Sequence, residues 1–225
     1  MLAAGRESSP DARAALGALC ETYWPPLYAY LRRADCTPNE AEDIVQGFFA
    51  RLLEKGDLAQ VAPERGRFRS FLLVAVKHFL ANERKSARAI KRGGGRKVVS
   101  LDVDMAESRY RAGSPTSGPT PEAVFERQWA ITLLDRVRGQ LRDEFTSAGK
   151  EERFEHMQPF LTGEGAGSHR EAATALGLSE NAFKVAIHRM RQRFGALLRA
   201  EIAQTVAGED DIDDEIRHLF EALRK

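Results

Sequence analysis

The stretch Phe68–Arg92, FRSFLLVAVKHFLANERKSARAIKR, decides how this chain folds. Its apolar residues recur at the i, i+3, i+4, i+7 spacing that places side chains along one side of an α-helix. They are Phe68, Phe71, Leu72, Ala75, Val76, Phe79 and Leu80. Cations stand on the opposite side, so the stretch predicts one long helix with a core-facing stripe and a basic outer edge.

Charge along this stretch is almost purely positive. From Arg65 to Lys97 the chain holds eleven Lys or Arg residues and one acid, Glu83. Solvated helix faces usually mix both signs, so this pattern favours a phosphate-rich partner. The alternative is that these side chains only cover apolar surface while their charged ends stay in water.

The composition is that of a soluble globular protein with one or two domains in 225 residues. The net charge of +1 hides the basic block, because the stretch 200–225 carries eight acids against three bases. No apolar run is long enough to span a membrane and the start lacks a signal-peptide pattern, so we expect a cytoplasmic protein. Cys20 and Cys36 have no metal-ligand spacing, so we expect free thiols, no metal and no cofactor.

Two further helices are expected before the basic one. The first spans Ala12 to about Arg33, and Pro25 and Pro26 are expected to kink or break it. The second follows Thr37-Pro-Asn-Glu40, a capping box with Pro at the first helical position. Three main helices in residues 12–92 therefore predict an all-α domain.

A change of composition separates this domain from a second helical region. Gly93–Gly95 stops the basic helix, and residues 98–121 lose the apolar period and read as a flexible linker. Helices are then expected from Thr120 to about Phe145 and from Lys150 to Leu161. Gly163–Gly167 is interpreted as a flexible turn, since no strand precedes it and no Lys-Ser/Thr follows it.

The sharpest local pattern follows. Ser168-His-Arg-Glu171 is a capping box of the S-x-x-E type, which predicts the start of a short helix. Gly177 predicts a tight turn with positive φ, and Ser179 the cap of a longer helix. This is the helix-turn-helix layout, in which the second helix meets base edges and phosphates. Its outward, N-terminal residues are the candidate DNA contacts: Glu180, Asn181, Lys184, Val185, His188 and Arg189. An ordinary helical hairpin with a glycine turn is the alternative.

Three segments together resemble bacterial sigma factors of the extracytoplasmic-function (ECF) type. Ala41–Glu54 is similar to the family's polymerase-docking segment, Phe68–Arg88 to its promoter-melting segment, and His169–Phe194 to its helix-turn-helix. The resemblance is close in particular to a planctomycete-like subgroup with the signatures GRFRSFLL (Gly66–Leu73) and DDEIRHLF (Asp213–Phe220).

The resemblance implies functional residues and partners. Asp43 and Gln46 would contact core RNA polymerase. The upstream promoter element and the opened strand would meet the residues Lys77, His78, Asn82, Arg84, Lys85 and Arg88. The distal promoter element would be read by Asn181, Lys184, Val185, His188 and Arg189. An anti-sigma protein or a kinase is left open as a further partner, and no catalytic residue is expected.

The implied fold is all-α. A region-2-like domain would span 12–97, a linker 98–121, a region-4-like helix-turn-helix domain 122–206 and an acidic amphipathic extension 207–225. The sequence departs from the family pattern at Gly47, where an acid is usual, and at His78, where Asn is common. The extension is expected to pack on one of the domains or to bind a regulator, and to hold basic surfaces closed.

The sequence leaves two other functions open. A stand-alone helix-turn-helix regulator would also bind DNA but would not require polymerase. An enzyme would need Glu40, Glu42 or Asp43 as a catalytic acid or metal ligand, and the sequence shows no partners for them. Acids at a helix N-terminus are expected for another reason, because they interact favourably with the helix dipole.

Overall fold

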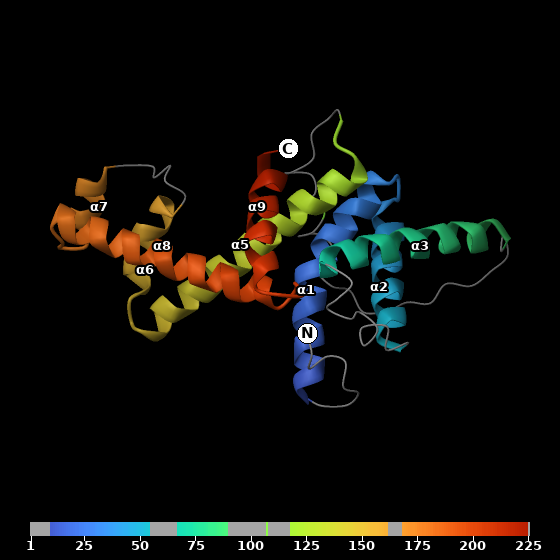
Figure 1. The fold of residues 1–225 in the computed structure, drawn as a ribbon. Coiled ribbons are helices and arrows are strands. Elements are labelled where there is room, and N and C mark those ends of the chain that lie inside the picture. The colour runs from blue at the N-terminus through green and yellow to red at the C-terminus, as the bar shows by residue number, and fades with distance from the viewer. Residues whose placement is uncertain (1–9, 55–66, 90–106, 108–117, 162–167, 225) are drawn as a thin grey trace. The chain divides into compact units, whose positions relative to one another are not determined.

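The computed structural model describes residues 10–54, 67–89, 107, 118–161 and 168–224, and every regular element among them is a helix. The predicted all-α class is therefore confirmed. The helices are α1 (Pro10–Arg33), α2 (Pro38–Glu54), α3 (Phe68–Ala89), α5 (Pro121–Ser147), α6 (Glu151–Met157), the 3-10 helix η3 (Gln158–Phe160), α7 (His169–Ala175), α8 (Glu180–Ala203) and α9 (Asp210–Arg224) (Figure 1).

These elements form two compact units. The first combines residues 1–132 with residues 202–225, and the second holds residues 133–201. The C-terminal extension thus belongs to the same unit as the N-terminal helices. The glycine stop at Gly93–Gly95, the turn at Gly163–Gly167 and most of the predicted linker lie outside the described residues.

In the first unit α1, α2 and α3 contact one another (Figure 1). The predicted apolar stripe of α3 supplies buried Phe68, Leu72, Val76 and Leu80 to their shared core. Tyr23 of α1 meets Phe68 edge to face, with ring centroids 5.2 Å apart. The periodicity of the sequence therefore gave the correct inner side of α3, because burial of one apolar stripe is what stabilises a surface helix.

Helix α1 continues through its two prolines, so the predicted break of this helix does not occur. It runs from Pro10 to Arg33 with Pro25 and Pro26 inside it. Each proline removes a backbone donor, at a cost of about 3 kcal/mol in an isolated helix. The buried residues on either side, including Trp24 and Leu27, explain why the helix persists.

The predicted capping box at the start of α2 is confirmed. The backbone N–H of Thr37 donates to Glu40 Oε2 at 2.8 Å, and the N–H of Glu40 donates to Thr37 Oγ1 at 3.3 Å. Because Thr37 donates hydrogen bonds to its carboxylate, the pKa of Glu40 is lowered. Glu40 therefore stabilises the N-terminus of α2.

The second unit has its own core. It joins the end of α5, α6, η3, α7 and the first half of α8 around fully or nearly fully buried apolar side chains. These are Leu141, Phe154, Met157, Phe160, Ala173, Phe183, Ile187 and Met190. Since Phe183, Ile187 and Met190 recur at helical spacing, one side of α8 is fixed against this core.

Helix α9 packs within the first unit. Its buried residues are Ile212, Glu215, Leu219 and Ala222, and Phe220 is 48% exposed on another side. The expectation that the extension packs on a domain is met there. No helix among the described residues has the length and apolar character needed to cross a membrane.

Candidate nucleic-acid interface

Helices α7 and α8 are joined by the predicted short turn, and a serine caps each helix. Ser168 caps α7 by accepting a bond from the N–H of Arg170 at 3.2 Å, where the predicted capping box would use the N–H of Glu171. Ser179 caps α8 by accepting from the N–H of Ala182 at 3.2 Å. Gly177 has a φ of 64°, a conformation that costs residues with a Cβ about 1–2 kcal/mol. The N–H of Leu178 closes the turn on the carbonyl of Ala173 at 2.8 Å.

The outward side of α8 carries the candidate base-reading residues. All five are exposed: Asn181, Lys184, Val185, His188 and Arg189. Val185 is 50% exposed, so its methyl groups are accessible to a partner. Lys184 pairs with Glu180 at 2.6 Å and thereby lowers the pKa of that carboxyl. The pair is solvent-exposed and therefore easily exchanged for a phosphate.

The candidate residues of α3 fall into two groups. His78, Asn82 and Lys85 are exposed. Lys77 pairs with Glu122 of α5 at 2.6 Å, with both side chains about two-fifths exposed. Arg84 donates to the carbonyl oxygen of Ala34 at 2.6 Å.

The bond from Arg84 has a clear physical role. Asp35 adopts a φ of 64° just after α1, and the last carbonyls of a helix carry partial negative charge. Arg84 thus stabilises the end of α1. The structure describes the backbone of Arg88 within α3 but not its side chain, so that predicted contact stays a prediction.

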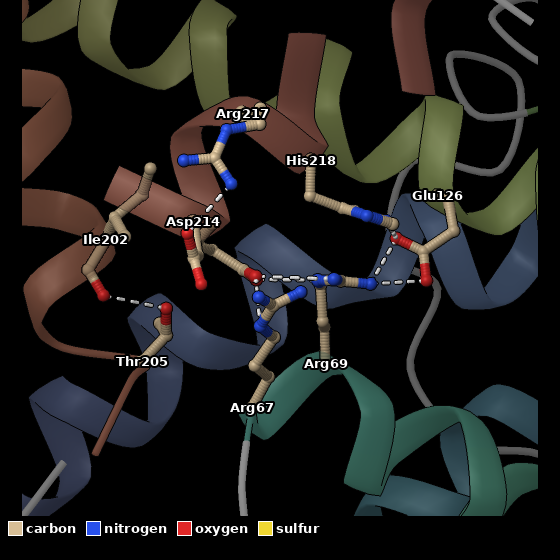
Figure 2. Close-up of polar contacts among 9 residues, drawn as sticks. Arg67, Arg69, Glu126, Ile202, Thr205, Asp214, Arg217 and His218 are labelled. Atoms are coloured by element: carbon tan, nitrogen blue, oxygen red, sulfur yellow. Dashed lines mark hydrogen bonds and ion pairs between the residues drawn. The ribbon is translucent and has the colours of Figure 1, made fainter. Parts of the chain in front are cut away.

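A partly buried ion cluster lies at the start of α3 (Figure 2). Glu215 of α9 is 1% exposed and pairs with Arg67 at 2.9 Å and with Arg69 at 2.5 Å. Arg69 also pairs with Glu126 of α5, whose carboxylate contacts His218 of α9 at 3.1 Å. We call these five residues the arginine–glutamate cluster.

Neighbouring groups reinforce this cluster. The guanidinium of Arg69 lies over the ring of Trp129, 4.9 Å from its centroid, a cation–π arrangement. Burial, and then the charge of Glu215, raise the pKa of the Tyr23 phenol. The N–H of Phe68 donates to the carbonyl of Thr205 at 3.1 Å, which satisfies one of the free donors at the start of α3.

The cluster was missed by sequence reasoning, which counted Arg67 and Arg69 with the phosphate-binding cations. These two arginines instead form ion pairs with carboxylates inside the first unit. The sequence did contain a signal: Glu215 stands in the same helical stripe as Ile212, Leu219 and Ala222, so an acid was placed on the apolar side of α9. A buried acid needs a cationic partner from elsewhere in the chain.

The cluster also connects the two segments that carry the subgroup resemblance. Gly66–Leu73 contributes Arg67 and Arg69, and Asp213–Phe220 contributes Glu215 and His218. Although 146 positions separate Arg69 from Glu215, their side chains bond directly. The two signatures therefore form one contact.

The candidate polymerase contacts lie on α2. Asp43 is exposed, and Gln46 is half-buried and donates to Glu42 Oε1 at 3.1 Å. Gly47 faces Phe79, whose nearest ring carbon would lie 3.4 Å from a Cβ at that position. A Cβ would therefore be in van der Waals contact with the ring of Phe79.

We find no match to the chain among protein-family models, curated proteins or solved structures. Within the described residues, no three His, Cys, Asp or Glu side chains are grouped so that they could hold a metal ion. The described geometry offers cationic and polar side chains on two exposed helices, an arrangement suited to binding a polyanion.

Proposed function

We propose that this chain is a transcription initiation factor of the ECF sigma type. It binds core RNA polymerase in the cytoplasm, directs it to specific promoters and aids strand opening. It uses binding energy for this and makes or breaks no covalent bond. Two observations support this function: the resemblance of the sequence to ECF sigma factors and the exposed polar faces of α3 and α8.

The observation that carries the proposal is the two-sided character of α8. Phe183, Ile187 and Met190 are held in the core of the second unit, while Asn181, Val185 and Arg189 are exposed on the outward side. A recognition helix needs this division, because its core side sets its orientation while its outward side enters the major groove. Asn and Arg can bond bases there, and Val can contact a thymine methyl group.

Helix α3 supplies the second proposed contact. His78, Asn82 and Lys85 are exposed and free to approach the upstream promoter element and the opened strand. Lys77 and Arg84 would exchange Glu122 and the Ala34 carbonyl for phosphates on binding. Such an exchange is inexpensive for Lys77 because its present pair is exposed.

A stand-alone helix-turn-helix regulator is the alternative. The internal partners of Lys77 and Arg84 favour it. If Lys77 and Arg84 keep their internal partners, α3 loses two of its cations for DNA and only α8 reads the duplex. Such a regulator has no need of polymerase, so polymerase binding separates the two functions.

The test is binding of the full chain to core RNA polymerase. We expect the wild-type chain to co-elute with the enzyme, and Asp43→Arg to weaken the complex because Asp43 is exposed on the proposed docking side of α2. Glu221→Arg is the matched control, an equal charge reversal on exposed α9. A wild-type chain that never joins the polymerase contradicts the proposal and leaves the regulator.

A further inference from the structure

A groove runs along one side of α8 in the second unit. Its volume is about 710 Å³, and its other wall comes from the end of α5 and from α6. Phe145, Met157 and Met190 give it an apolar floor, and Lys150, Arg153 and Arg189 stand among its lining residues. Asn181 and Val185, two candidate base-reading residues, also line it, so the groove is continuous with the outward side of α8.

The charge of the groove is positive. Its lining includes the cations Lys150, Arg153, Arg189 and Arg193 and a single acid, Glu144. Glu144 is neutralised by Arg193, whose Nη2 and Nε lie 2.5 and 2.9 Å from its two carboxylate oxygens, and this pairing lowers the pKa of Glu144.

Three of these cations are available to a ligand. No ion pair joins Lys150, Arg153 or Arg189 to an acid within the part of the chain that the structure describes. Two nearby acids of α6 are engaged elsewhere, since Glu151 and Glu155 pair with Arg142 at 3.2 and 3.1 Å. Among the described residues, the groove therefore presents three cations without an acidic partner around an apolar floor.

We propose that this groove seats one sugar–phosphate strand of the duplex that α8 enters, with Lys150 and Arg153 binding its phosphates. The inference rests on the proposed function and assigns two contacts beyond the recognition helix. Deoxyribose presents an apolar surface between regularly spaced anions, which matches an apolar floor with cations around it. Phosphate contacts of this kind fix the register of a reading helix on DNA.

Salt dependence tests the proposal. The full chain carrying Lys150→Gln, Arg153→Gln or both is titrated against short fluorescent duplexes of randomised sequence at several KCl concentrations. Each lost phosphate contact reduces the slope of log K against log salt by about 0.9. We expect that reduction for each single variant, roughly twice that for the double variant, and lower affinity at every salt concentration.

Arg138→Gln is the matched control, because Arg138 is an exposed α5 cation paired with Asp135 and is absent from the groove lining. Circular dichroism checks that each variant keeps its helices. Wild-type slopes in the groove variants, with affinity lost only on Lys184→Gln, overturn the groove assignment and leave DNA reading by α8 intact. A wild-type chain that binds no duplex at low salt overturns the assignment together with DNA binding.

Discussion

The start of α3 and the outward side of α8 use the same kind of residue in opposite ways. Arg69 is 4% exposed and bonds two carboxylates from α5 and α9. Arg189 is exposed and has no ion-pair partner among the described residues. One arginine stabilises the first unit, and the other is available to an external anion.

This difference shows that a count of cations along a sequence does not measure the charge offered to a partner. Of the basic residues between Arg65 and Lys97, Arg67, Arg69, Lys77 and Arg84 have partners inside the chain. The free surface of α3 is less cationic than its sequence indicates. On α8, by contrast, the five candidate base-reading residues are all exposed, and Lys184 among them pairs with Glu180.

The largest expected effect comes from removing one charge from the arginine–glutamate cluster at the start of α3. Glu215→Gln removes a carboxylate that is 1% exposed and leaves Arg69 undercompensated. Loss of one partner from a buried ion pair costs about 3 kcal/mol of unfolding free energy. Urea unfolding followed by tryptophan fluorescence measures this, because both tryptophans, Trp24 and Trp129, lie in the first unit.

Glu221→Gln is the matched control for that measurement. It lies on the same helix and is exposed, so its effect on unfolding free energy should stay within about 0.5 kcal/mol. Equal losses for Glu215→Gln and Glu221→Gln would show that the arginine–glutamate cluster does not hold α9 in place.

The sequence predicted those parts of the fold that depend on local patterns. The helices, the Thr37–Glu40 capping box and the positive φ of Gly177 follow from neighbouring residues. Which cations are free could not be predicted, because Arg69 finds its partner 146 positions away. Pairing at that separation depends on tertiary packing, which no local period encodes.

A smaller effect is expected from removing a charge on the outward side of α8. Arg189→Gln should leave unfolding free energy within about 0.5 kcal/mol of wild type, since the side chain is exposed. DNA affinity should fall roughly tenfold, the consequence of one lost base or phosphate contact. Fluorescence anisotropy with labelled duplex measures the affinity.

Arg217→Gln gives the matched loss of charge on α9, where Arg217 is exposed and paired with Asp214 at 2.9 Å. A similar fall in affinity for Arg217→Gln would mean that the overall charge, and not the outward side of α8, determines binding.

The smallest expected effect concerns Lys77, which is paired like Arg69 but partly exposed. Glu122→Gln releases Lys77 from an exposed pair worth about 0.2–1 kcal/mol, so DNA affinity should rise by a factor between about 1.4 and 5. Glu83→Gln removes the same charge from the exposed part of α3 without breaking that pair. An equal rise in both variants would attribute the effect to net charge alone, and no rise would indicate that Lys77 does not bind DNA.

Transcription in vitro tests the central claim most directly. Core RNA polymerase is incubated with the full chain and a pool of genomic DNA fragments, and transcript starts are sequenced. The account predicts discrete starts that appear only with the chain and are lost when Lys184 and Arg189 are both changed to Glu. Starts that are the same without the chain, or that are unaffected by Lys184→Glu with Arg189→Glu, would contradict it.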